Sequence, residues 1–298
     1  MRGCLRDLTI RIKKREEPLF HVKELFLGSP GGKGLFTCIV GPTGCGKSSL
    51  LKVVGGFTSR LIVDGEVRTE KLSLGFLPQV PVIFPQLSAF ENATYLSHLK
   101  AWREQRDCVI AEVNRLGSVL NLDWNKLNRT PAEKWSGGER QRIALVRALS
   151  GKCDLMLLDE PCAGLDVHTR RKLLDLLRRE LVRAGTHALY VTHHGDEVLW
   201  AADEVLTFCR DSGCGTTFNV FRQSLSEAIR DPLSPEAALS VGMPINDLQG
   251  SIADSTHDSH AISRIELTLK CGATLVDFDD GARVIVSTTP SQPSQKLS

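Results

Sequence analysis

One glycine-rich stretch near the start of the chain has the residue types needed to bind a polyphosphate. GPTGCGKSS, at positions 41–49, fits the pattern G-x-x-x-x-G-K-[ST] without exception. The glycines let the backbone curl so that successive N–H groups face the phosphates. Lys47 can reach the outer phosphates, and the Ser48 hydroxyl can ligate Mg²⁺. An ordinary strand-to-helix loop is the alternative, but the sequence favours a nucleotide site made of Gly41, Pro42, Thr43, Gly44, Cys45, Gly46, Lys47, Ser48 and Ser49.

Two carboxylates follow a second apolar run, LMLLDE at 155–160. Asp159 would leave a strand at its C-terminal edge, where parallel sheets place their ligands, and would hold Mg²⁺ directly or through water. Glu160 could orient and deprotonate an attacking water, which is the part that hydrolysis requires of a base. An acidic pair after a strand is usually a solvated strand end, but after this phosphate loop it indicates a hydrolytic site.

A second helix start can also bind an anion. In EKWSGGERQRIALVRAL, at 133–149, Ser136, Gly137 and Gly138 put small side chains and unpaired N–H groups where the helix dipole favours negative charge. This stretch lacks the lysine of the first loop. The question is therefore why one chain carries two such helix starts.

Other classes of phosphate-loop protein need residues that this sequence does not have. A GTPase needs an N-K-x-D motif, and NKLN at 125–128 lacks its aspartate. A small-molecule kinase would have no use for SGGERQR, and a chromosome-maintenance ATPase would need hundreds of heptad residues. A formal charge of +2, from 37 basic and 35 acidic residues, does not mark a nucleic-acid binder or a membrane-surface binder.

The chain is similar to the ATP-binding subunits of ABC transporters from about Leu8 to Cys209. The resemblance rests on five motifs in the family's order: the phosphate loop, Gln79 after a strand, WSGGE, LMLLDEP followed by AGLD, and VTHH. It implies an α/β P-loop NTPase of the ABC type that uses ATP and Mg²⁺. Trp135 and Glu139 depart from the leucine and glutamine that are commonest in the WSGGE signature.

The resemblance also assigns roles by position. Gln79 becomes a switch glutamine that senses Mg²⁺ or the attacking water, and His193 a switch histidine that contacts the γ-phosphate. Asp166 falls in the loop that contacts a second subunit. The signature would clamp the γ-phosphate held by Lys47 of that subunit, so it needs no lysine; its residues are Ser136, Gly137, Gly138 and Glu139. The predicted catalytic residues are Glu160, His193 and Gln79, and the predicted metal ligands are Ser48, Gln79 and Asp159.

The aromatic residue that stacks on adenine in this family is missing. Glu17 and Pro18 lie where it is expected, about 24 residues before Gly41. Either Phe20 substitutes for it, or the base is only weakly stacked.

The resemblance implies partners as well. A second ATP-binding subunit, most simply an identical copy, would complete the site, and integral membrane permease subunits would meet the stretch VPVIFPQLSAFENATY at 80–95. An extracytoplasmic binding protein would take part indirectly. These partners would hold the chain as a peripheral subunit at the cytoplasmic face of the cell membrane. A separate chain with a C-terminal strand-rich extension resembles bacterial importers, so import is favoured. The alternative is a soluble ABC-type ATPase in an assembly or repair complex.

The elements that must position these residues alternate along the chain. Apolar stretches predict strands at 8–12, 35–40, 72–79, 154–161, 187–194 and 203–209. Helical spacing predicts helices at 47–55, 139–149, 168–185 and 195–202, and a helical insert in which Asp107 caps a helix. This alternation indicates a mostly parallel sheet. Gly65 predicts a hairpin turn, and the strand at 203–209 is expected to be the last, with a short helix at 221–232.

The chain is expected to divide into two domains. An ABC-type core would span 1–225 and include a helical subdomain at about 80–150. A small β-rich regulatory extension would span 226–298, with strands at 262–271, 273–278 and 282–288 and a disordered tail from about 289. No apolar run approaches the roughly 18 residues of a membrane span. The charged start argues against a secretory leader, and nine scattered cysteines suit a reducing cytoplasm.

Overall fold

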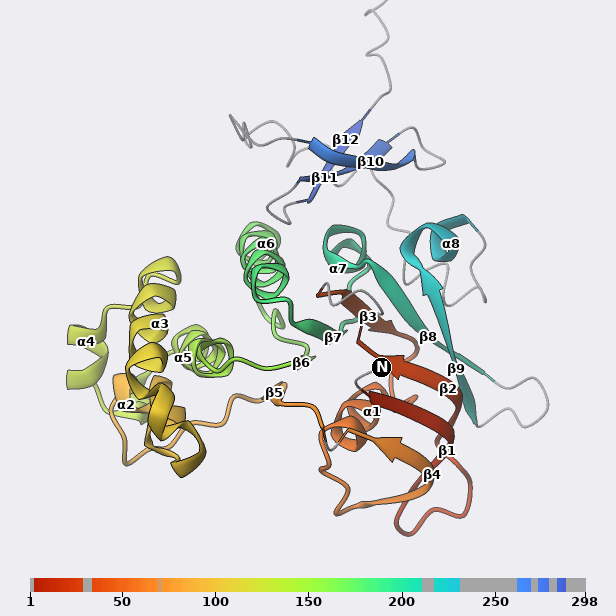
Figure 1. Cartoon of the computed structure of the whole chain (residues 1–298), viewed down its shortest axis with the longest axis horizontal. Coiled ribbons are helices and arrows are strands. Elements are labelled where there is room, and N and C mark those ends of the chain that lie inside the picture. The colour runs from red at the N-terminus through yellow and green to blue at the C-terminus, as the bar shows by residue number, and fades with distance from the viewer. Residues whose placement is uncertain are drawn as a thin grey trace, which may run out of the picture.

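Nine strands form one sheet, and the phosphate loop follows the C-terminal end of one of its inner strands. The computed structural model describes residues 3–28, 34–69, 71–210, 217–230, 262–268, 273–278 and 283–287. In space the strands follow the order β4-β1-β2-β9-β8-β3-β7-β6-β5 (Figure 1). Their bounds are β1 Gly3–Ile12, β2 Phe20–Leu27, β3 Phe36–Val40, β4 Leu61–Arg68, β5 Leu74–Leu77, β6 Leu155–Asp159, β7 His187–Val191, β8 Glu204–Arg210 and β9 Phe218–Ser224.

The parallel half of the sheet explains the continuous apolar runs. β3 pairs in parallel with β7 and β8, and β6 pairs in parallel with β5 and β7. β3, β6 and β7 are buried along their whole length. A strand buried on both faces has no polar side to alternate with, so the predicted buried strands are confirmed. β2 and β9 also pair in parallel, whereas β1 with β2 and β4, and β8 with β9, are antiparallel.

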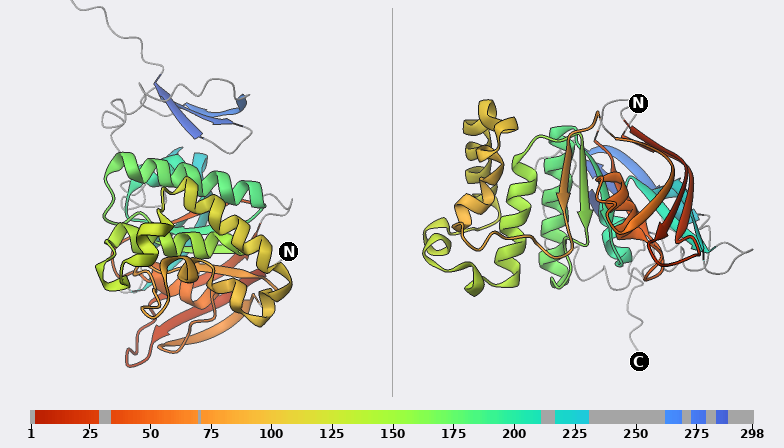
Figure 2. Two further views of the ribbon diagram at one scale, coloured as in Figure 1. Left: turned by 90° about the vertical axis from the view of Figure 1, so that its left-hand side faces the viewer. Right: turned by 90° about the horizontal axis from the view of Figure 1, so that it is seen from below.

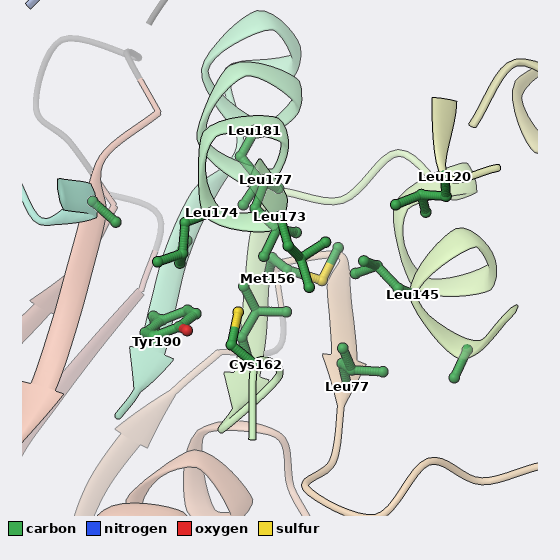
Figure 3. Packing of buried hydrophobic residues seen from close by; sticks show 14 of the residues in the cluster. Leu77, Leu120, Leu145, Met156, Cys162, Leu173, Leu174, Leu177, Leu181 and Tyr190 are labelled. Atoms are coloured by element: carbon green, nitrogen blue, oxygen red, sulfur yellow. The ribbon is translucent and has the colours of Figure 1, made fainter. Parts of the chain in front are cut away.

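Alternate residues of the central strands face two separate cores. Met156 and Leu158 of β6 pack with α6 (Val167–Ala184) and α7 (Gly195–Ala201), whereas Leu155 and Leu157 pack with α1 (Lys47–Val54). Figure 3 shows the first core, where leucines of α6 lie over Met156 and Tyr190. Because helices cover both faces, the C-terminal ends of the parallel strands form a rigid edge for the loops.

A group of helices lies at the β5 end of the sheet (Figures 1 and 2). It consists of α2 Ala89–Ala93, α3 Arg106–Val119, α4 Trp124–Arg129 and α5 Gly137–Ser150, with 3₁₀ turns at Tyr95–His98, Lys100–Gln105 and Ala132–Lys134. The predicted helical insert is therefore confirmed. The predicted cap is wrong, because the residue that precedes α3 is Gln105 and Asp107 lies in the first turn, where its charge suits the helix dipole.

Gly65 does not form the predicted hairpin turn. It lies inside β4 with a φ of 112°, opposite an irregularity in β1 beside Asp7. A Cβ at this position would lie 2.4 Å from the Asp7 carbonyl oxygen. The glycine is needed for a close approach of two strands, which is a second common use of glycine within strand patterns.

The sheet continues past the strand that was expected to be its last. β9 pairs antiparallel with β8 and takes up the first four residues of the predicted helix at 221–232, and Leu225–Arg230 form the helix α8. The Arg222 guanidinium on β9 binds both carboxylate oxygens of Glu204 on β8. The helix-like spacing of residues 221–232 therefore gives no indication that β9 pairs with β8.

The C-terminal part of the chain contains the three predicted strands. β10 Ile262–Thr268, β11 Ala273–Phe278 and β12 Arg283–Ser287 form an antiparallel sheet in the order β10-β11-β12. The division into a separate domain at 226–298 stays a prediction. The predicted tail from about 289 lies outside the described residues.

Candidate active site

The phosphate loop connects β3 to α1. Val40 ends the strand, and Gly46, with a left-handed φ of 110°, immediately precedes the helix at Lys47. A Cβ at Gly46 would lie 2.6 Å from the Phe20 ring, so both the backbone angle and the space require glycine. The predicted strand–loop–helix setting of the motif is confirmed, and no residue other than glycine fits at position 46 of the pattern.

The side chain of Lys47 points into the curl of this loop. Its ammonium donates hydrogen bonds to the carbonyl oxygens of Gly41 and Pro42, at 2.8 and 2.9 Å. The residue is only 5% exposed, and this burial lowers the pKa of the ammonium from its ordinary value. The cation is therefore held where the loop would receive phosphates.

Ser48 and Asp159 face each other from α1 and β6. The Ser48 hydroxyl donates to Asp159 Oδ1 at 2.9 Å. Burial raises the pKa of the Asp159 carboxyl, and the hydrogen bond from Ser48 partly opposes that effect. A hydroxyl and a carboxylate beside a phosphate loop are oxygen donors of the kind that Mg²⁺ prefers. Two of the three predicted metal ligands are thus brought together.

The three predicted catalytic residues also meet. Glu160 follows β6, Gln79 follows β5 and His193 follows β7, which are neighbouring strands in the sheet (Figure 1). The Gln79 side-chain amide donates to Glu160 Oε2 at 2.8 Å, and His193 Nε2 lies 2.6 Å from Glu160 Oε1. The structure therefore places Gln79 on Glu160 rather than on Ser48 or Asp159.

The signature residues lie at the start of α5. Ser136 precedes the helix and forms a reciprocal cap, in which its N–H donates to the Glu139 carboxylate and its hydroxyl accepts the Glu139 N–H. The Ser136 N–H and hydroxyl both donate to the Glu139 carboxylate, and these two bonds lower the pKa of that carboxyl. Glu139 therefore closes its own helix start, a role that the spacing S-x-x-E could have indicated. Gly137 is exposed, and a Cβ there would meet nothing within 4 Å.

Asp166 has a capping role as well. It precedes α6 and accepts a hydrogen bond from the Thr169 N–H at 3.0 Å, and hydrogen bonds from Thr169 lower its pKa. The carboxylate lies at the surface, on the loop that the sequence predicts to meet a second subunit. That contact stays a prediction.

Trp135, the unusual residue of the signature, is buried in the helical insert. Its indole N–H donates to the carbonyl oxygens of Thr130 and Leu127, at 2.9 and 3.3 Å, at the end of α4. The last carbonyls of a helix lack partners within the helix. The tryptophan therefore ties the end of α4 to the start of the signature helix.

Phe20 does not stand in for the missing aromatic residue. It is fully buried beneath the phosphate loop, with its ring edge-on to Phe208 at a centroid distance of 5.2 Å. A cavity of about 610 Å³ lies beside Thr43 and Gly44 instead. Its other walls come mainly from charged residues at 14–17 and from Pro18, Leu19, Arg210 and Phe218. A base bound there would meet mainly charged groups, because the Phe218 ring in this lining is only 7% exposed and has the Arg210 guanidinium over it.

The comparisons with known proteins agree with this geometry. A family model described as ABC transporter matches residues 32–163. The molybdate/tungstate import ATP-binding protein WtpC of Thermococcus kodakarensis is 36% identical over 194 residues, which are 62% of this chain and 57% of that protein. The Fe(3+) ions import ATP-binding protein FbpC of Mesorhizobium japonicum is 33% identical over 253 residues, which are 78% of this chain and 68% of that protein. This chain belongs to the ABC transporter ATP-binding proteins.

A solved ATP-binding cassette has the same fold as this chain. A dimeric post-hydrolysis structure of the ATP-binding cassette MJ0796, bound to ADP and Pi, aligns with a TM-score of 0.57 at 22% identity and covers 74% of this chain and 98% of that one. The chain spans little more than half the length of WtpC. Within the described ranges, the structure has no helix that is both apolar enough and long enough to span a bilayer.

Proposed function

We propose that this chain is the ATP-binding and ATP-hydrolysing subunit of an ABC importer. The contacts of Glu160 with Gln79 and His193 carry the proposal, because Glu160 adjoins Asp159, whose hydrogen bond with Ser48 joins this cluster to the phosphate loop. Membership of the ABC family and relatives that are named import ATP-binding proteins support it. The soluble assembly or repair ATPase has no comparable support.

The chain's own residues divide the work of hydrolysis. The loop N–H groups and the Lys47 ammonium bind the phosphates of ATP. Ser48 and Asp159 would hold Mg²⁺, which when bound neutralises charge on the phosphates. Glu160 orients an attacking water and accepts its proton, while Gln79 and His193 fix the direction of the Glu160 carboxylate.

A second copy of the chain completes each site. The start of α5 offers N–H groups and the positive end of the helix dipole to an anion, and exposed Gly137 leaves room for it. α5 and α1 lie apart in the fold (Figure 1), so one chain would present two half-sites to the same partner. Each signature then receives a phosphate whose counter-charge is Lys47 of the other subunit.

The surface that follows Gln79 is the proposed contact with membrane permease subunits. Val80 and Val82 are 77% and 52% exposed, which is unusual for valines next to a functional site. Beside them a cavity of about 330 Å³ is lined by residues that include Phe84, Tyr95 and Leu99. An apolar segment of a permease would cover this surface and hold the chain at the cytoplasmic face of the membrane, with a binding protein engaged only through the permease.

One preparation tests the proposal. The tagged chain, purified in mild detergent with its partners, should hydrolyse ATP and carry an integral membrane protein with it. Lys47→Ala should weaken nucleotide binding by about 10-fold or more, because it removes charge-assisted hydrogen bonds to phosphate. The matched control is Lys23→Ala, an exposed lysine on β2, which should bind ATP normally. Wild-type chain without ATPase activity, alone or with its partners, would contradict the proposal.

A further inference from the structure

A buried polar network lies behind the active site, between α6, β7 and α7. At its centre Glu197 of α7 is 2% exposed. Its carboxylate accepts hydrogen bonds from the hydroxyls of Tyr190, at 2.7 Å, and Thr192. Thr192 immediately precedes His193, which contacts the Glu160 base. Glu197 therefore holds the loop that carries the switch histidine.

The same carboxylate faces an arginine whose side chain is only 11% exposed. Arg170 Nε of α6 lies 3.3 Å from Glu197 Oε1, and another nitrogen of the guanidinium donates to Asp196 at 3.3 Å. The third nitrogen donates to the carbonyl oxygen of Leu165 at 3.1 Å. Leu165 immediately precedes Asp166. One guanidinium thus holds the Asp166 loop by a hydrogen bond and faces the carboxylate that holds the His193 loop across a charge contact, which is not a hydrogen bond.

A contribution to stability does not by itself explain the Arg170–Glu197 ion pair. Desolvation of two buried charges commonly offsets their attraction, so an apolar pair of similar volume is often as stable. A second ion pair, between Arg178 of α6 and Asp203, has a purely structural use. Arg178 donates to the Ala201 carbonyl and to Asp203, and Asp203 accepts the Phe36 N–H. None of these contacts involves the Asp166 loop or the His193 loop. The Arg170–Glu197 pair differs because each of its ends holds a loop of the proposed dimer site.

We propose that Arg170 and Glu197 are positioning residues that couple closure of the dimer to the switch histidine. A partner subunit that orders the loop at Asp166 fixes the Leu165 carbonyl, and Arg170 transmits this restraint to Glu197 and through Thr192 to His193. Neither residue touches the nucleotide. The inference rests on the proposed function, since it needs a second subunit at Asp166 and hydrolysis by Glu160.

The proposal predicts that the loss of kcat caused by a change at Glu197 depends on the presence of His193. Glu197→Gln keeps the shape of the side chain but removes the charge that faces Arg170. It should lower kcat about 2- to 30-fold, the range of coupling changes seen along such networks, with the KM for ATP unchanged. In a His193→Ala background, Glu197→Gln should cause no further loss of kcat, because the group through which it acts is gone.

The test is a double-mutant cycle on kcat with Glu197→Gln, His193→Ala and the double variant. Arg178→Lys is the matched control, and any loss that it causes should be the same with and without His193. If Glu197→Gln does not fold, Thr192→Val removes the same link and Thr192→Ser should restore kcat. Equal losses from Glu197→Gln in both backgrounds, or a lower unfolding midpoint with unchanged kcat, would overturn the inference. A wild-type chain without ATPase activity would instead overturn the proposed function.

Discussion

At the scale of single residues, Glu160 has a backbone conformation that side chains rarely adopt. Its φ is 49°, in the left-handed region, which costs a non-glycine residue roughly 1 kcal/mol. Three contacts hold it there: its N–H donates to the Val191 carbonyl at 3.1 Å, and Gln79 and His193 bind its carboxylate. Backbone strain of this kind is found where a structure fixes a side chain for function.

Trp135 allows a direct test at the same scale. Trp135→Phe removes the indole N–H and leaves the carbonyls of Leu127 and Thr130 without that donor. The Leu127 carbonyl keeps the Thr130 N–H, so the loss falls on the Thr130 carbonyl, and the free energy of unfolding should fall by about 1–3 kcal/mol, the usual cost of one unsatisfied polar group. Urea unfolding followed by circular dichroism measures this loss, and nucleotide binding should not change. A Trp135→Phe protein as stable as the wild type would show that the two bonds contribute nothing.

Single residues could be predicted where a short motif fixes them. Lys47, Asp159 and Glu160 follow from local spacing, because a loop between strand and helix or the end of a strand sets where each points. The sequence leaves open whether Phe20 replaces the missing aromatic residue, because nothing in its neighbours reveals that it is buried under Gly46. The network of Glu197 had one usable signal: Tyr190 puts a hydroxyl in a buried apolar strand, where it needs a partner.

At the scale of elements, the site depends on the neighbouring ends of β5, β6 and β7. Parallel pairing places the residues that follow these strands side by side, although 81 positions separate Gln79 from Glu160. The sheet must therefore keep its register, and glycines help it at close approaches. Gly65 is such a position on β4, against the Asp7 backbone.

Replacement of Gly65 tests the role of that close approach. Gly65→Ala brings a Cβ within 2.4 Å of a carbonyl oxygen, so β4 must shift away from β1. Gly56→Ala is the matched control, because Gly56 also has a positive φ, 78°, but a Cβ there would meet nothing within 4 Å. Gly65→Ala should lower the free energy of unfolding by at least about 1 kcal/mol more than Gly56→Ala. Equal losses would mean that the strands adjust freely.

The elements of the parallel half could be predicted, and those of the antiparallel half only in part. In a sequence that alternates strands and helices, long apolar runs such as those of β6 and β7 predict buried parallel strands. β9 was missed because it is a polar, half-buried strand whose place is set by pairing with β8 and by the Arg222–Glu204 ion pair. Such partners lie 18 positions apart and are invisible to a local pattern.

At the scale of the whole molecule, the two helix starts that can bind phosphate lie in different parts of the fold, α1 after a strand of the sheet and α5 in the helical insert. One, at α1, contains its own cation, and the other, at α5, has an internal cap and an exposed glycine. We propose that both act on one nucleotide only when two chains face each other, with α1 of one chain opposite α5 of the other. ATP would then hold the pair together, and hydrolysis at Glu160 would release it and move the permease.

The molecular mass of Glu160→Gln with and without ATP tests this account most directly. The variant should hydrolyse ATP very slowly and change from monomer to dimer when ATP is added. Adding Gly137→Arg, at a position with open space around it, should leave ATP binding intact but abolish the dimer. A Glu160→Gln protein that binds ATP and stays monomeric, or that dimerises equally well with Gly137→Arg, would contradict the shared site.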